Sequence, residues 1–164
     1  MLSKVGDPAH FDQLVPLVSD EHSDVAIKAY RALANTGRPE AADALATRLG
    51  DGDFLQRDAL TTAFQRVGAV GVPALVAALG DADAAVREHA ADALGHLGSP
   101  AADAAIDALA AMVGDTDESV RVTAVSALGQ LGDGADAALS VIAEGPHATL
   151  AAIASRRLAQ RAAV

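Results

Sequence analysis

The sequence predicts an all-α protein, a right-handed α-solenoid of five helix-turn-helix units with about ten helices. Three observations lead to this fold class. Apolar residues make up 51% of the chain but aromatic residues only 2%, which favours closely packed Ala-rich helices over β-sheets. The sequence repeats itself with a period near 30 residues, and each repeat carries its apolar residues at helical spacing.

The repeat is clearest in two segments, GDADAAVREHAADALGHLG at 80–98 and GDTDESVRVTAVSALGQLG at 114–132, which are identical at more than half of their positions. The same frame fits residues 19–37 and 50–68, and a degenerate copy occupies 144–162. One slot of the frame is filled in turn by Val25, Gln56, Val86, Val120 and Leu150. The sequence therefore predicts a single domain over 1–164, with units at about 7–37, 38–68, 69–98, 99–132 and 133–162.

Each unit is expected to contain two helices. In the second helix the apolar positions fall on one face, as in Val86, Ala90, Ala93, Leu94 and Leu97. The first helices carry a sparser pattern of apolar pairs spaced i, i+4, such as Leu45 and Leu49. Four extra residues precede Val120, and they predict a first helix in unit four that is longer by about a turn.

A D-x-D motif lies between the two helices of the middle three units. Asp immediately before a helix accepts hydrogen bonds from its free N–H groups and interacts favourably with the positive end of its dipole. Paired carboxylates also occur in acid-base catalysis and calcium sites, but recurrence at the same structural corner favours capping. The aspartates concerned are Asp51, Asp53, Asp81, Asp83, Asp115 and Asp117.

An arginine follows the valine slot in the same three units, at Arg57, Arg87 and Arg121. It lies near the positive end of the helix dipole, so we expect it to pair with carboxylates of adjacent turns. Arg–Asp bonds repeated from unit to unit would form a ladder that fixes their stacking. Units one and five have Ala26 and Ala151 there, so the ladder should stop at the ends.

The string D-x-D-x-x-V-R-x-x-A-A-x-A-L-G-x-L-G is complete at 81–98 and nearly so at 115–132. It resembles the HEAT-like repeats of phycobilisome lyase subunits and of many other proteins. The resemblance covers essentially the whole chain and implies the solenoid fold. It leaves function open, because the family includes chromophore lyases, scaffolds and signalling adaptors. Unit five departs most, with Arg157 and Arg161 in apolar slots, and resembles a C-terminal cap.

The resemblance implies that the second helices line the concave side, where the positions beside the apolar stripe would face a ligand. We call this strip the ledge. Its cations in a chain of net charge −10 favour an acidic partner segment, while the alternative is an ordinary solvated surface. The candidate partner-binding residues of the ledge are Lys28, Arg31, Asn35, Thr62, Arg66, His89, Asp92, His96, Thr123, Ser126, Gln130 and Arg156.

Phe54 and Leu55 precede the valine slot of unit two and complete the candidate binding residues. If both are exposed, they could form the energetic centre of a protein contact. Alternatively, Leu55 turns inward to replace Gln56, an unusual residue for a core slot, and leaves only Phe54 outside.

His89, Asp92 and His96 fall within one narrow strip of a helix and could suggest a metal site. His89 and His96 are, however, about 10.5 Å apart along the axis at 1.5 Å per residue. Both imidazoles could not reach one ion with bonds of about 2 Å without strain. We therefore predict no metal.

Composition narrows the function classes. The chain has no cysteine, so disulfides and thiolate chemistry are excluded, and it lacks a long uninterrupted apolar run. Residues 81–145 carry 12 acidic and 2 basic residues, which disfavours binding to nucleic acid. We expect a cytoplasmic protein with no membrane segment and no cofactor.

The function expected from these observations is that of a non-catalytic protein-binding scaffold or adaptor. The alternative is a bilin lyase-type or chaperone subunit that handles a chromophore or a substrate protein. A tetrapyrrole pocket would need aromatic walls and clustered arginines, and the sequence offers four aromatic residues and dispersed arginines. The identity of the partner and the oligomeric state stay open.

Overall fold

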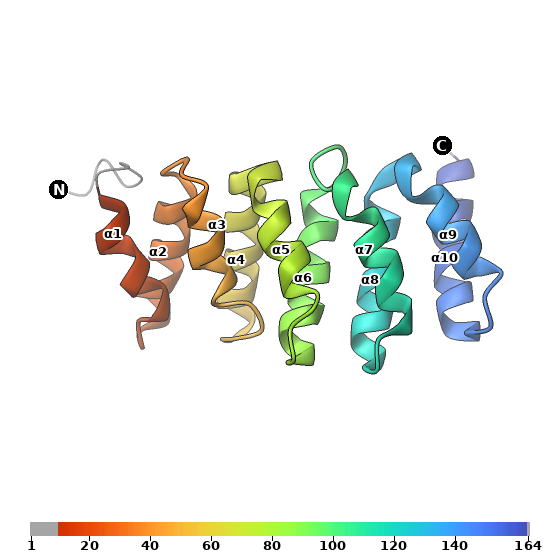
Figure 1. Cartoon of the computed structure of the whole chain (residues 1–164), viewed down its shortest axis with the longest axis horizontal. Coiled ribbons are helices and arrows are strands. Elements are labelled where there is room, and N and C mark those ends of the chain that lie inside the picture. The colour runs from red at the N-terminus through yellow and green to blue at the C-terminus, as the bar shows by residue number, and fades with distance from the viewer. Residues whose placement is uncertain (1–9, 164) are drawn as a thin grey trace.

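A computed structural model describes residues 10–163 and shows a row of helix pairs (Figure 1). Residues 7–9 of the first predicted unit lie outside the described part. The first helices of the units are α1 (Phe11–Leu14), α3 (Glu40–Ala46), α5 (Val72–Ala78), α7 (Ile106–Ala111) and α9 (Asp136–Ala143). The second helices are α2 (Ser23–Ala34), α4 (Phe54–Val67), α6 (Ala84–Leu97), α8 (Glu118–Gln130) and α10 (Ala148–Ala162).

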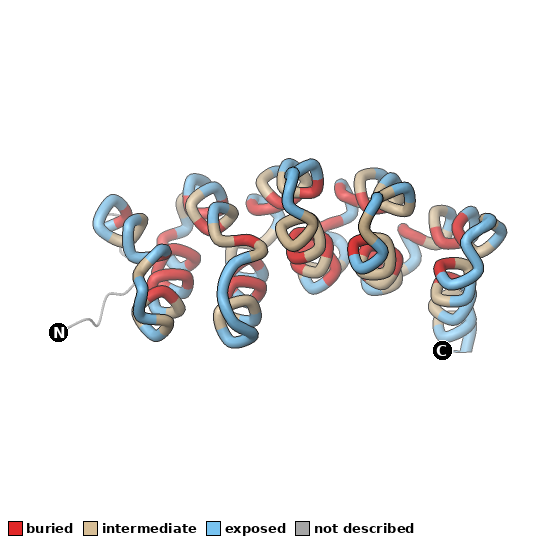
Figure 2. The backbone as a smooth tube through the Cα atoms, turned by 90° about the horizontal axis from the view of Figure 1, so that it is seen from below, coloured by how far each residue is buried: buried red, intermediate tan, exposed pale blue. Residues whose placement is uncertain are grey.

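The helices form two layers. Each second helix packs on the second helix of the next unit, so that α2, α4, α6, α8 and α10 follow one another in chain order. The first helices are shorter, and 3₁₀ turns lead into or out of most of them. Figure 2 shows that the row is bowed, with the first helices on its outer side and the second helices on its inner side. The described residues contain no strand, and the predicted all-α solenoid is confirmed.

The aspartates of the D-x-D motif begin the second helices. Asp53, Asp83 and Asp117 are the N-cap residues of α4, α6 and α8, and their carboxylates accept hydrogen bonds from N–H groups of the first turn. In units three and four the preceding carboxylates, of Asp81 and Asp115, accept from the N–H of the capping residue at 2.8 Å. The glycines that end the second helices of units one to four adopt φ between 68° and 75°, a conformation that stops a helix.

The core fills the space between the two layers. Leucines of the first helices alternate with those of the second, and aromatic rings enter it only in units one and two. The largest side chains without solvent exposure include Leu33, Leu45, Leu60, Phe64, Leu75, Leu94, Leu109, Leu128 and Leu139. Each unit therefore buries its apolar stripe on its neighbours, as a solenoid requires.

Close packing of α6 on α8 depends on Gly95. A Cβ atom at this position would lie 2.9 Å from the Cα of Ala127 and 2.8 Å from the Oε1 of Gln130. The corresponding residue of α8 is Gly129, where a Cβ would lie 2.7 Å from the Cδ of Arg157 on α10. A side chain at Gly95 would push α8 away, because the Ala127 backbone stands in its path, whereas a side chain at Gly129 would displace the Arg157 side chain.

The Arg–Asp ladder has only one rung in the described chain. Arg87 donates from Nε and Nη2 to both carboxylate oxygens of Asp115, each at 2.8 Å, and this pairing lowers the pKa of Asp115. Arg121 instead donates to the Asp115 carbonyl oxygen of its own turn at 2.8 Å, and Arg57 to the Gly50 carbonyl oxygen at 2.6 Å. The prediction of pairing between units was therefore wrong for these two arginines.

The two missing rungs have different causes. Unit five places Gly145 where Asp115 stands in unit four, so Arg121 has no carboxylate to meet. Between α4 and α6 the interface holds Gln65 and His89, which are bulkier than Gly95 and Thr123 at the equivalent places between α6 and α8. These larger side chains account for the failure of Arg57 to reach Asp81.

The four extra residues of unit four do not lengthen its first helix. Helix α7 spans only Ile106–Ala111, and the extra length forms a loop between α6 and α7, visible above these helices in Figure 1. The predicted extra turn of helix was therefore wrong. Ser99 and Pro100 begin this loop, and the residue before a proline avoids the helical conformation.

Unit five ends the array with arginines rather than a further apolar stripe. Arg161 forms an ion pair with Asp136 and donates to the carbonyl oxygens of Leu128 and Gly129, at 3.2 and 2.7 Å. Both carbonyls lie in the last turn of α8, where the helix leaves carbonyl oxygens without full hydrogen bonding; that of Leu128 also accepts from the Leu131 N–H at 3.2 Å. The arginine in an apolar slot therefore satisfies the end of the preceding helix.

One stretch of the described chain, Phe54–Ala78, is long and apolar enough to cross a membrane when only length and composition are considered. It is divided in the structure, because α4 ends at Val67 and Gly68 adopts a φ of 70° before α5 begins. Its apolar residues Leu60, Phe64 and Leu75 belong to the core shared with neighbouring helices. The apolar character of this stretch is thus explained by packing within the solenoid.

His89 ties the turn before α4 to helix α6. The Gly50 N–H donates to Nδ1 of His89 at 3.2 Å, while Nε2 lies 3.2 Å from Oγ1 of Thr61 and 3.3 Å from the Arg57 carbonyl oxygen. Since Nδ1 accepts a hydrogen bond, the imidazole is neutral with its proton on Nε2. Burial lowers the pKa of His89, because a charged ring would lose its hydration there.

We predict that Gly95→Ala destabilises the protein by about 1–3 kcal/mol in urea unfolding, because the methyl group forces α6 away from α8. The predicted destabilisation is a net value: the cost of separating the helices exceeds the roughly 0.8–1 kcal/mol of helix stability that Ala offers over Gly. Gly114→Ala is the control, since a Cβ at Gly114 meets no atom within 4 Å. Equal stability of the two variants would refute the close-approach explanation.

We predict that the neutral state of His89 makes the fold sensitive to mild acid. Its folded pKa lies below the unfolded value of about 6.5, so its contribution is complete above that pH and is lost as the pH falls toward the folded pKa. Between pH 7.5 and 5 the melting temperature of the wild type should fall by a few degrees more than that of His89→Gln. His147→Gln, at an exposed position, should follow the wild-type curve, and parallel curves for all three proteins would contradict the prediction.

Candidate functional site

The ledge residues do not share one environment. Most are exposed on the inner side, namely Lys28, Arg31, Asn35, Thr62, Arg66, His96, Gln130 and Arg156. Asp92, Thr123 and Ser126 are half-buried between neighbouring helices. The ledge prediction was wrong for His89, which is only 5% exposed because its ring fills the space between α4 and α6.

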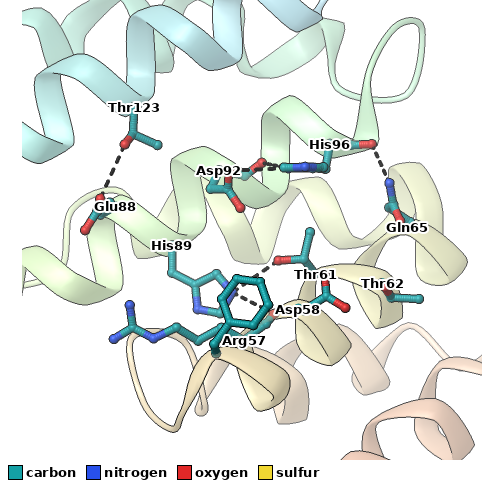
Figure 3. A pocket seen from close by; sticks show the side chains of 11 residues that line it. Arg57, Asp58, Thr61, Thr62, Gln65, Glu88, His89, Asp92, His96 and Thr123 are labelled. Carbon is teal, nitrogen blue, oxygen red and sulfur yellow. Dashed lines mark hydrogen bonds and ion pairs between the residues drawn. The ribbon is translucent and has the colours of Figure 1, made fainter.

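A groove of about 450 Å³ runs between α4 and α6 on the inner side, and we call it the α4–α6 groove (Figure 3). Helix α4 contributes one wall, α6 contributes the other, and Thr123 of α8 closes one side. The buried ring of His89 faces α4 at its base, beside Thr61. The lining residues are Phe54, Arg57, Asp58, Thr61, Thr62, Gln65, Glu88, His89, Asp92, His96 and Thr123.

The groove exists because α4 does not pack on α6 as closely as α6 packs on α8. Gln65 of α4 occupies the position that is Gly95 in α6 and Gly129 in α8. Its Nε2 donates to the carbonyl oxygen of His96 at 2.9 Å, so the amide group spans the gap that a glycine would have closed. Gln65 thus keeps α4 and α6 apart at the point where α6 and α8 approach closely.

Three carboxylates line the α4–α6 groove. Within residues 10–163 none of them forms a salt bridge with a lysine or arginine. Asp92 lies 3.3 Å from Nδ1 of His96, and Glu88 meets only Oγ1 of Thr123 at 3.5 Å. The side chain of Asp58 is exposed on α4. The lining also holds one guanidinium, that of Arg57, which donates to the Gly50 carbonyl oxygen and offsets only one of the three negative charges. The groove is therefore acidic.

A second groove of about 260 Å³ lies between α2 and α4, and we call it the α2–α4 groove. Two arginines, Arg31 and Arg66, give it the opposite sign of charge. Arg66 donates to Oδ1 of Asn35 at 3.4 Å, and Arg31 is exposed. The lining residues are Ile27, Arg31, Leu55, Asp58, Ala59, Thr62, Ala63 and Arg66.

Phe54 and Leu55 are the first two residues of α4, and they are 79% and 65% exposed. The alternative in which Leu55 turns inward is therefore wrong. Gln56 is half-buried and completes a capping box: its Oε1 accepts from the Asp53 N–H at 3.0 Å, and its own N–H donates back to Asp53 at 2.9 Å. Phe54 lines the α4–α6 groove and Leu55 the α2–α4 groove.

The strip of His89, Asp92 and His96 does not converge on one point. Both ring nitrogens of His89 face protein atoms of the Gly50 turn and of α4, whereas His96 faces Asp92 on its own helix (Figure 3). Over the described residues no group of three or more His, Asp or Glu side chains is placed to hold a metal ion.

A third groove of about 620 Å³ lies between the first helices α7 and α9, and no sequence prediction anticipated it. Its walls are largely apolar and include Ile106, Val113 and Val141, the last 73% exposed. Two sequence signals accompany it: the extra residues before α7 and the small Ala143 in a slot that is Leu or Val in the other first helices.

Comparison with known proteins gives the family. The family model described as HEAT repeats matches residues 1–65 and 72–159. No curated protein matches the chain.

Three solved structures illustrate the likeness of fold. A chain from the CpcE–CpcF complex of phycocyanin lyase from Nostoc sp. PCC7120 is 20% identical, with a TM-score of 0.61 over 93% of this chain and 99% of that one. A chain from a structure on microtubule plus-end tracking by XMAP215, CLIP-170 and EB1 is 15% identical, with a TM-score of 0.73 over 93% and 74%. A chain from a structure on TOG–tubulin binding specificity is 16% identical, with a TM-score of 0.65 over 92% and 66%. At these identities the likeness is one of fold, and together with the family match it shows that the chain belongs to the HEAT-repeat family.

Proposed function

We propose that this protein is a non-catalytic binding scaffold or adaptor that holds a protein partner against the inner faces of α2, α4 and α6. The observation that carries the proposal is the exposure of Phe54 and Leu55, side by side at the start of α4. Each side chain adjoins one of the two inner grooves. A large aromatic ring and a branched aliphatic side chain next to polar hollows form the usual energetic centre of a protein interface.

The carboxylates that recur in the repeat and the buried histidine serve the fold, which favours binding over catalysis. The carboxylates that recur in the D-x-D turns are committed to helix capping, as the bonds of Asp83 and Asp117 illustrate. His89, the most buried polar residue of the groove, has both nitrogens in contact with protein atoms. These groups hold the fold together and are not free to transfer protons to a substrate.

A bilin lyase-type or chaperone subunit is the alternative role, and a fold neighbour from a phycocyanin lyase gives it some support. A tetrapyrrole needs extended apolar walls. Phe11, Tyr30 and Phe64 are buried in the core, which leaves Phe54 as the one exposed aromatic ring among the described residues. The scaffold role is therefore favoured, and titration of a bilin followed by absorbance separates the two.

We predict that the double change Phe54→Ala and Leu55→Ala abolishes capture of the partner from a lysate of the source cells while leaving the melting temperature unchanged. Full burial of each side chain at an interface contributes about 1.5–3 kcal/mol, so binding should weaken by more than tenfold. Val141→Ala is the matched control, since it also removes an exposed apolar side chain, but from the outer layer. A captured protein that binds the double variant as well as the wild type would disprove this use of the surface.

A further inference from the structure

From the two inner grooves we infer the chemistry of the partner: a protein segment that carries a basic side chain, an apolar side chain and an acidic side chain across helix α4. The basic side chain occupies the acidic α4–α6 groove, and the acidic one faces Arg31 and Arg66 in the α2–α4 groove. This inference rests on the proposed function and adds the nature and direction of what is bound.

The two grooves have opposite charge within the width of one helix. Asp58 and Thr62 line both, so the grooves meet along the exposed face of α4. On the α6 side stand Glu88 and Asp92, and on the α2 side stands the pair of arginines. A segment with charge of a single sign would be attracted by one groove and repelled by the other, so a mixed segment is favoured.

The carboxylates of the α4–α6 groove are available to a ligand. Glu88 and Asp92 are half-buried, and over residues 10–163 their polar contacts within 3.5 Å are limited to Thr123 and His96. Partial burial strengthens the attraction for a cation, since fewer water molecules screen it. At about 450 Å³ the groove falls in the range of roughly 300–1,000 Å³ found for ligand sites, so it can receive a long basic side chain.

The exposed pair Phe54 and Leu55 supplies the apolar part of the same surface. Phe54 lies one helical turn before Asp58, so both project from one side of α4. An aromatic face beside the groove can also contact the stem or the charged head of a bound Arg or Lys. The apolar residue of the partner segment would therefore lie between its two charged residues, against this pair.

The test uses a phage-displayed library of random linear peptides selected on the intact protein. Selected peptides should carry an Arg or Lys and an Asp or Glu on either side of an apolar residue. Their affinity should fall at least about tenfold in Glu88→Gln/Asp92→Asn and also in Arg31→Gln/Arg66→Gln. The control is Asp43→Asn/Asp107→Asn, which removes two exposed carboxylates from the outer-layer helices α3 and α7. It changes the net charge by the same amount as Glu88→Gln/Asp92→Asn, and it should change the affinity less than twofold.

Double-mutant cycles assign the direction of binding. When the basic residue of the peptide is replaced by Ala, the loss of binding free energy should be non-additive with that of Glu88→Gln/Asp92→Asn and additive with that of Arg31→Gln/Arg66→Gln. Replacing the acidic residue of the peptide should give the reverse pattern. Peptides that need Phe54 and Leu55 but show no such charge pattern would overturn the inference and leave the proposed function standing. A library that yields no peptide dependent on Phe54 and Leu55 would overturn both.

Discussion

The distance between neighbouring second helices is the constraint on which the rest of this structure depends. Where Gly95 faces Ala127, backbone approaches backbone and the inner surface is closed. Where Gln65 stands in the equivalent place, the amide spans the gap to the His96 carbonyl and a groove opens beside it. The array has no central core, so each such contact sets the local shape by itself. Between α4 and α6 this position therefore holds the two helices apart beside a groove, whereas between α6 and α8 it lets them touch.

The same opening explains how polar groups come to lie between helices of an apolar stack. His89 is tolerated there because the Gly50 N–H and Thr61 meet both of its ring nitrogens. Arg57 turns to the carbonyl of its own turn, and so the ion pair that joins α6 to unit four through Arg87 and Asp115 has no counterpart between α4 and α6. Units two and three are joined by neutral hydrogen bonds and units three and four by a bidentate ion pair. The two interfaces therefore respond differently to pH.

The repeat pattern was sufficient to predict the helices, their order and their capping chemistry, because these depend on residues a few positions apart. The capping role of Asp83 and the buried face of the helix around Leu94 could be predicted for that reason. The burial of His89 and the hydrogen-bond partner of Arg57 could not be predicted, since both depend on how far apart two helices lie. Gln56 was misleading because a slot for a core residue and the third position of a capping box coincide at the start of a helix. The one sequence signal for the acidic groove is Gln65, which stands at the repeat position that is Gly95 in α6 and Gly129 in α8.

An array in which one contact is looser than the others is mechanically uneven. Units three and four share the glycine contact and the Arg87–Asp115 pair, while the junction between α4 and α6 has neither. Because each contact of a solenoid sets the local angle between two units, a change in the spacing of α4 and α6 would change the curvature of the row. A ligand bound between α4 and α6 would then fix the spacing of these helices and, through it, the curvature of the whole chain.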